Sequence, residues 1–182
     1  MMLLASNPKI QEKVQKELDE VVGLSRAPSI LDRQKLHLSE AMVLEILRMA
    51  CTAPLLLPHN TVTDTELLGY KIPQNTVVLF NIISSNMDPL YWRSPYEFRP
   101  ERFLDKDGKV DHEKAENVLT LGAGRRRCIG EQLARSNLYV FLTTILQRCK
   151  ITKPQGEDYD FEGKLTLIYV PKPFKIKVVE RS

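Results

Sequence analysis

Residues 8–21 repeat apolar positions at helical spacing, which predicts an amphipathic helix that packs one face on a partner surface. Pro8 suits the first turn of this helix, Asn7 is a candidate cap, and Gly23 is the expected end. Glu17 lies off the apolar stripe and is expected to face solvent. The stripe consists of Ile10, Val14, Leu18 and Val21.

Two further helices are apolar around most of their circumference, so we expect both to be buried. The first is predicted to run from Ser39, which can cap it, to about Ala50, and the second covers residues 129–148. Residues 24–38 are predicted to form a loop with one short helical turn around Ser29–Arg33.

Shorter apolar runs between turn residues predict strands. A turn is expected at Asp64–Glu66, and residues 174–178 alternate apolar and basic side chains as an edge strand does. The other predicted strands are Thr61–Thr63, Leu67–Ile72, Thr76–Ile83 and Leu165–Val170.

From Asn86 to Lys109 there is no periodicity and proline recurs, which is typical of a functional loop; we call this segment the meander. The sequence therefore predicts an α+β fold, mainly α, in which long helices accompany a small β-sheet. We expect residues 1–182 to form a single domain.

Composition excludes several classes of protein. The chain has 182 residues, 43% of them hydrophobic, and a formal net charge of +3, too small to indicate a nucleic-acid partner. No apolar run approaches the roughly 20 residues of a membrane span, so we expect no membrane anchor in this chain. Three widely spaced cysteines form neither a disulfide framework nor a zinc pattern, which favours a reducing compartment.

The most informative segment is residues 121–130, Leu-Gly-Ala-Gly-Arg-Arg-Arg-Cys-Ile-Gly, which we call the Cys-loop. Gly124 and Gly130 are expected to allow a close backbone approach or a positive φ. The following helix N-terminus and Arg125–Arg127 place positive charge near Cys128, which favours the thiolate, the metal-binding form. The Cys-loop therefore predicts a single axial metal ligand.

An alternative interpretation makes the Cys-loop an anion-binding turn at a helix N-terminus, with Cys128 as an inert apolar side chain. A phosphate-binding module of this kind predicts a strand directly before the loop. Residues 117–121 give only a weak strand signal.

Glu45 and Arg48 lie three residues apart on the otherwise apolar second long helix, so they are neighbours on one face. A buried charge requires a partner, and we expect these two side chains to be paired.

The Cys-loop resembles the haem-ligand loop of the cytochrome P-450 superfamily, whose pattern is F-x-x-G-x-R-x-C-x-G. Gly124, Arg126, Cys128 and Gly130 match this pattern, and Leu121 replaces the usual phenylalanine.

Two further motifs carry the same resemblance. Glu45 and Arg48 match the family's E-x-x-R signature, and Arg99–Phe103 matches its P-E-R-F meander, with Arg99 where aspartate is frequent. The resemblance covers essentially the whole chain, corresponds to the C-terminal part of the family's domain, and is greatest to the animal microsomal group. It implies that Arg102 completes a structural ion cluster with Glu45 and Arg48.

The resemblance also implies a cofactor, haem b, with the Cys128 thiolate as axial ligand of the iron. Arg126 and His59 match positions that bind the haem propionates, and Gly124 and Gly130 would belong to the same cofactor site. Four residues match segments that line the substrate pocket, although core packing alone would explain some of them equally well. These residues are Ala53, Leu57, Ile168 and Tyr169.

The implied activity is that of a monooxygenase, an oxidoreductase that activates O2 and hydroxylates a lipophilic steroid or xenobiotic. An NADPH-dependent reductase would supply electrons at the cytoplasmic face of the endoplasmic reticulum membrane for the full-length family member. We find no distal oxygen-activating residues, so no catalytic residue is assigned, and we expect apolar faces, notably that of residues 10–21, to remain exposed. A non-catalytic haem-binding or interaction remnant of the family is the alternative.

Overall fold

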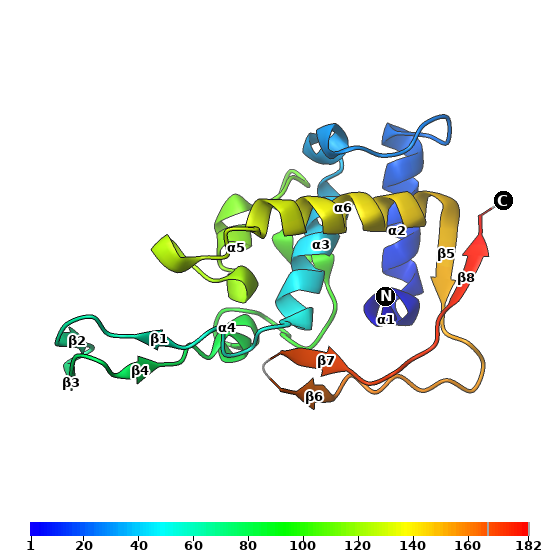
Figure 1. Cartoon of the computed structure of the whole chain (residues 1–182). Coiled ribbons are helices and arrows are strands. Elements are labelled where there is room, and N and C mark those ends of the chain that lie inside the picture. The colour runs from blue at the N-terminus through cyan, green and yellow to red at the C-terminus, as the bar shows by residue number, and fades with distance from the viewer. Residues whose placement is uncertain (167, 182) are drawn as a thin grey trace.

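The computed structural model describes residues 1–166 and 168–181, and this part of the chain is mainly helical, with four two-stranded sheets around three long helices (Figure 1). The mainly α class expected from the sequence is confirmed. The long helices are α2 (Pro8–Val21), α3 (His37–Ala50) and α6 (Glu131–Arg148). The short ones are α1 (Met2–Ser6), α4 (Ile82–Asn86), α5 (His112–Glu116) and the 3-10 turns η1 (Ile30–Gln34), η2 (Pro100–Phe103), η3 (Leu119–Leu121) and η4 (Gly124–Arg126).

The hydrophobic core lies where α6 crosses α2 and α3 (Figure 1). Val14 and Leu18 of α2 are completely buried in this core, as is Leu146 of α6. The expectation that the apolar face of residues 10–21 stays exposed is therefore wrong for most of this face, because α3, α6 and the strand Cys149–Thr152 pack against it; only Val21 of the stripe remains exposed.

Strands β5 (Cys149–Thr152) and β8 (Lys177–Glu180) form an antiparallel pair, and α2 packs beside β5. The Gln11 side-chain amide donates to the Ile151 carbonyl at 2.9 Å and accepts from the Ile151 N–H at 2.6 Å. Gln15 donates to the Cys149 carbonyl at 3.0 Å. The two glutamines thus bind the free edge of β5 as a neighbouring strand would, which satisfies its buried backbone groups.

A narrow arm holds β1 (His59–Asn60) paired with β4 (Val77–Val78), and β2 (Thr65–Leu67) paired with β3 (Tyr70–Ile72) (Figure 1). The single strand expected over Leu67–Ile72 is therefore a hairpin. Its turn falls at Leu68 and Gly69, which both have positive φ, rather than at residues 64–66.

The other strand predictions also need correction. Thr61–Thr63 is not a strand, because the Thr61 backbone bonds to the turn before β4, and Thr76–Ile83 divides into β4 and α4. The single strand expected over Leu165–Val170 is instead a hairpin of β6 (Gly163–Leu165) and β7 (Tyr169–Pro171), so the predicted range spans its turn. Leu167 lies outside the described residues. The edge strand expected at 174–178 is β8, which starts later.

Two helix starts differ from the prediction. The Asn7 side chain does not cap α2; its amide donates instead to the Leu3 carbonyl of α1 at 2.8 Å. Helix α3 begins at His37, two residues before Ser39, because a side chain from another helix caps it. Gly23 does end α2 as expected, with φ +70° and its N–H bonded to the Leu18 carbonyl.

The cap of α3 is the Glu17 carboxylate of α2. It accepts hydrogen bonds from the Leu38 N–H at 2.7 Å, the Ser39 N–H at 2.8 Å and the Ser39 hydroxyl at 2.7 Å. Glu17 thus satisfies backbone donors that a helix start leaves free, and its negative charge suits the positive end of the helix dipole. The residue expected to face solvent joins α2 to α3.

We predict that Glu17→Ala lowers the free energy of unfolding by about 1–3 kcal/mol, because the fully buried Ser39 and its neighbour lose their acceptor. Denaturant titration followed by circular dichroism measures this change. The matched control is Glu20→Ala, which removes only an exposed carboxylate 3.8 Å from Lys16 and should change stability little. Equal effects of the two substitutions would contradict the capping role.

Candidate functional site

The Cys-loop connects η3 to α6, and backbone hydrogen bonds fix its shape. The Cys128 N–H donates to the Leu121 carbonyl at 2.8 Å, and the Glu131 N–H donates to the Cys128 carbonyl at 3.2 Å. The Cys128 side chain is exposed, and α6 starts three residues later at Glu131. A thiol is thus presented at the N-terminal end of a long helix on a backbone that holds it in place.

Three glycines shape this loop: Gly122, Gly124 and Gly130. Gly124 has φ +64°, one of the two properties expected of these glycines, whereas Gly130 has φ −87° and does not use a positive φ. A Cβ atom at Gly130 would lie 3.8 Å from the Cys128 sulfur. Sequence reasoning missed Gly122, which has φ +80° and whose added Cβ would lie 3.4 Å from the Arg127 Cα. The available signal was a second glycine, two residues before Gly124, in the same short loop.

The arginines of the Cys-loop are exposed, so their charge is available to a partner. Arg127 lies 3.7 Å from the Glu131 carboxylate, which Arg135 binds more closely at 3.0 Å. In the described residues neither Arg126 nor Cys128 has a side-chain hydrogen bond or ion pair. Before the loop stands the 3-10 turn η3 rather than a strand. This contradicts the phosphate-module interpretation, which needed a strand directly before the loop.

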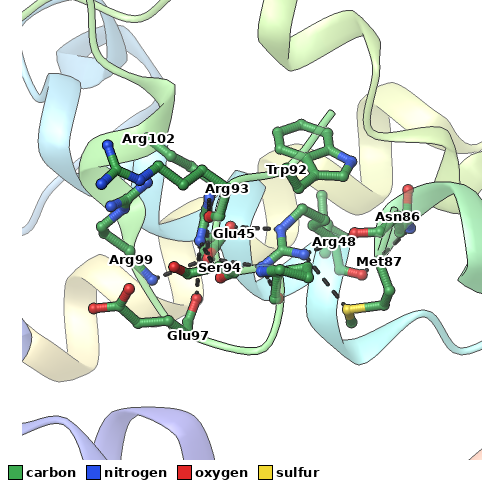
Figure 2. Close-up of polar contacts among 12 residues, drawn as sticks. Glu45, Arg48, Asn86, Met87, Trp92, Arg93, Ser94, Glu97, Arg99 and Arg102 are labelled. Atoms are coloured by element: carbon green, nitrogen blue, oxygen red, sulfur yellow. Dashed lines mark hydrogen bonds and ion pairs between the residues drawn. The ribbon is translucent and has the colours of Figure 1, made fainter. Parts of the chain in front are cut away.

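A buried ion cluster lies under the meander and contains Glu45, Arg48 and Arg102 (Figure 2). Arg48 binds the Glu45 carboxylate with two nitrogens, at 2.8 and 2.9 Å, and Arg102 binds it at 3.0 Å. The Arg99 backbone N–H donates to the same carboxylate at 2.9 Å. One carboxylate thus joins α3 to η2, and the structure brings together the three residues that the sequence groups.

The two guanidiniums use their remaining donors on meander backbone carbonyls, as Figure 2 shows. Arg48 donates to Asn86 at 2.7 Å and to Pro95 at 2.8 Å, and it lies over the Trp92 ring at 5.4 Å. Burial lowers the pKa of Arg102, and the Glu45 carboxylate opposes that shift. Arg102 donates to the carbonyls of Arg93, Ser94 and Glu97. These contacts hold a segment without regular structure in one conformation.

A second network, which the sequence did not indicate, connects the ion cluster to the Cys-loop. The Asn86 side-chain amide donates to the Arg48 carbonyl at 3.3 Å and to the Thr120 hydroxyl at 2.9 Å. The Thr120 hydroxyl donates to the Leu47 carbonyl at 2.7 Å. Thr120 precedes Leu121, whose carbonyl accepts the hydrogen bond from the Cys128 N–H. The network therefore connects helix α3 to the start of the Cys-loop.

Cys51 lies beside this network and is buried. Burial raises the pKa of the Cys51 thiol to about 11, while hydrogen bonds from Asn86 and Thr120 act in the opposite direction. Cys51 therefore stays a neutral thiol near pH 7. Cys149, at the start of β5, is partly exposed.

The pocket candidates come from two segments that lie side by side. The Tyr169 N–H donates to the Thr52 carbonyl at 2.7 Å, which brings the β6–β7 hairpin next to the segment holding Ala53 and Leu57. Leu57 and Ile168 are exposed, and Ala53 is half-buried. The Tyr169 hydroxyl donates to the Phe161 carbonyl at 3.2 Å, so it bonds within its own hairpin.

His59 starts the arm and is half-buried. Its ring contacts the Phe80 ring edge to face, with centroids 5.3 Å apart.

Among residues 1–166 and 168–181, no three His, Cys, Asp or Glu side chains are placed to hold a metal ion. The helices in these ranges are also too short or too polar to cross a bilayer.

We predict that Glu45→Ala lowers the free energy of unfolding by about 3–5 kcal/mol, because it leaves two buried guanidiniums without their carboxylate. Chemical denaturation measures the change. Glu101→Ala in the same meander is the matched control, since its pair with Lys13 at 2.6 Å is partly exposed and contributes about 0–1 kcal/mol. A Glu45 variant as stable as the Glu101 variant would show that the cluster does not hold the meander.

Comparison with known proteins supports the interpretation of these motifs. The family model for cytochrome P450 matches residues 1–178. The chain is 44% identical over 170 residues to cytochrome P450 1A2 of Canis lupus familiaris, covering 93% of this chain and 32% of that protein. It is 40% identical over 182 residues to cytochrome P450 1B1 of Rattus norvegicus, covering 100% of this chain and 34% of that protein.

The chain thus spans about a third of the length of the relatives it matches. Its three motifs, its mainly helical fold and the family match over nearly all its residues agree with one another. The chain belongs to the cytochrome P450 family.

Proposed function

We propose that this chain binds haem b through the Cys128 thiolate and forms the ligand side of a haem monooxygenase. The observation that carries this proposal is the exposed Cys128 thiol, held at the N-terminal end of α6 by the hydrogen bond from its own N–H to Leu121. Residues 121–130 carry the family's ligand-loop pattern on this backbone.

The residues present fit such a cofactor. A haem brings four nitrogen ligands of its own, so the protein needs to supply only one axial donor, and an exposed thiol is a suitable one. Around Gly124 no atom lies within 4 Å of where a Cβ would stand, and the three arginines beside it are exposed. The loop is therefore open at Gly124, four residues before the thiol, where a flat ligand could approach the backbone.

Arg126 and His59 would hold the two carboxylates of the macrocycle. Arg126 is exposed beside Cys128, and its guanidinium can form charge-assisted hydrogen bonds with a carboxylate. The His59 ring contacts Phe80 edge to face, and among residues 1–166 and 168–181 its nitrogens form no hydrogen bond, so they could bind a carboxylate. Gly124 and Gly130 contribute space and backbone rather than a bond.

When bound through a thiolate, haem supplies O2 activation, since the ligand's electron density favours O–O cleavage. The chain's own residues orient and support that ligand: Glu45, Arg48 and Arg102 fix the meander, and Asn86 with Thr120 fixes the start of the Cys-loop. Ala53, Leu57, Ile168 and Tyr169 would contribute to the pocket for a lipophilic steroid or xenobiotic substrate. We assign no catalytic residue in this chain.

We further propose an NADPH-dependent reductase as electron donor, acting at the cytoplasmic face of the endoplasmic reticulum membrane. Arg125 and Arg127 support this partner because both are exposed on the ligand side, and Arg127 is only loosely paired with Glu131. Exposed positive charge of this kind attracts an acidic protein surface and raises the association rate.

Haem binding without turnover is the second candidate. One observation favours it: every motif identified here supports the ligand rather than the oxygen-activating side. Coupled product formation with a reductase and a lipophilic substrate would separate the two, because both candidates predict the same haem spectrum.

We predict that Cys128→Ser abolishes the red-shifted Soret band that the haem-loaded chain gives after reduction and addition of carbon monoxide. The reason is that a serine hydroxyl cannot supply the thiolate. Cys149→Ser is the matched control, since it removes another accessible thiol from β5 and should keep the band. Persistence of the band in the Cys128 variant would refute the ligand assignment.

We predict that the double substitution Arg125→Glu, Arg127→Glu slows reduction of the haem-loaded chain by the reductase several-fold at low ionic strength, and by less as salt screens the charges. Stopped-flow reduction over a salt series measures this. The charge-matched control is Lys175→Glu with Lys177→Glu, on the exposed C-terminal segment. Equal rates for both double variants at every salt concentration would rule out a docking role for the Cys-loop arginines.

A further inference from the structure

Met87 places a thioether sulfur against the buried ion cluster. Its Sδ lies 3.5 Å from Nη1 of Arg48, the same nitrogen that donates to the Asn86 carbonyl at 2.7 Å (Figure 2). A thioether is only a weak hydrogen-bond acceptor, so the contact contributes little stability by itself. It does, however, put an oxidisable atom directly beside the guanidinium that holds the meander.

Solvent also reaches the Met87 side chain. Met87 is partly exposed, and it lines an open cavity of about 690 Å³. Most of the other residues around this cavity are exposed, among them Ser84, Ser85, Pro89 and Tyr96. A small neutral oxidant can therefore approach Met87 while the chain stays folded.

The other four methionines of the chain have different surroundings. Met2 and Met42 are buried. Met1 and Met49 are partly exposed, but both pack against the hydrophobic core. Access for an oxidant and contact with a buried charge thus coincide at Met87.

We propose that Met87 is a site of reversible oxidation by hydrogen peroxide, and that its sulfoxide loosens the hold of Arg48 on Asn86. In the reaction the sulfur lone pair attacks one peroxide oxygen, so an S–O bond forms while the O–O bond breaks and water leaves. The sulfur is oxidised and the peroxide is reduced. Methionine sulfoxide reductases reverse the modification. The proposal rests on Met87 and its contacts, so it stands or falls separately from haem binding.

The added oxygen changes the contact with Arg48. A sulfoxide is polar, and a hydrogen bond from nitrogen to its oxygen needs about 2.9 Å between these two atoms. Because Sδ and Nη1 are only 3.5 Å apart, an oxygen fits between them only if Met87 or the guanidinium moves. Either movement strains the bond from Arg48 to Asn86, since Met87 directly follows Asn86 in the chain. Asn86 also binds Thr120, so the effect extends toward the Cys-loop.

The first test measures where peroxide acts. The full chain is treated with dilute hydrogen peroxide well below its melting temperature, and peptide mass spectrometry gives the oxidation rate of each methionine. We expect Met87 to be oxidised several-fold faster than Met42, which is 0% exposed. Equal rates would mean that Met87 reacts only after unfolding, and would overturn the proposal.

The second test measures what the sulfoxide does to stability. Met87→Leu keeps the side-chain volume but cannot be oxidised, and Met49→Leu near the end of α3 is the matched control. We expect peroxide to lower the melting temperature by about 2–4 °C in the unsubstituted chain and in the Met49 variant, but not in the Met87 variant. Cysteine oxidation is common to all three proteins, so the difference between them isolates Met87.

Reversal by enzymes completes this test. Methionine sulfoxide reductases of both stereochemical types should return the oxidised chain to its original melting temperature. The proposal fails if oxidation of Met87 leaves the melting temperature unchanged, if the Met87 variant loses as much stability as the control, or if the reductases do not restore it.

Discussion

The fold depends on keeping one carboxylate, that of Glu45, charged and fully buried. A buried charge is stable only when its partners surround it, and Glu45 receives two guanidiniums and one backbone N–H. Those guanidiniums are also buried, so their other donors require acceptors, which the meander carbonyls supply. A single charge on α3 therefore determines the path of a segment that has no regular structure.

The same requirement reaches the candidate haem site through backbone groups. Arg48 holds the Asn86 carbonyl, and the Asn86 side chain binds Thr120, one residue before the acceptor of the Cys128 N–H. Backbone hydrogen bonds fix the shape of the Cys-loop itself, and the Asn86–Thr120 network fixes where the loop starts relative to α3. The buried ion cluster and the exposed Cys128 thiol are thus connected. The cluster and its hydrogen bonds hold the backbone below the thiol, and the exposed arginines of the Cys-loop supply positive charge at the surface.

The sequence predicts features that depend on neighbouring residues, such as helices, but not contacts between residues far apart in the chain. The three long helices follow from apolar periodicity, and the Glu45–Arg48 pair follows from helical spacing. The place of Arg102 in the ion cluster could be predicted only from the resemblance to a family motif. The Glu17 cap and the Asn86–Thr120 bond join residues 22 and 34 positions apart, and no local pattern encodes either pairing. The β2–β3 turn was misplaced because leucine is not a turn residue, so nothing at position 68 signals positive φ.

The pairing of Gln11 with Ile151 has a consequence for how the chain acquires its structure. These residues are 140 positions apart, and together with Gln15 they join the first long helix to the last sheet. Contacts of such long range slow folding, because the loop they close must be ordered before the contact forms. During synthesis β5 leaves the ribosome after α3 and α6, which also pack on α2, so the bonds of Gln11 and Gln15 form last. Helix α2 therefore reaches its full packing only when most of the chain has been made, and the surface that β5 covers stays open to chaperones until then.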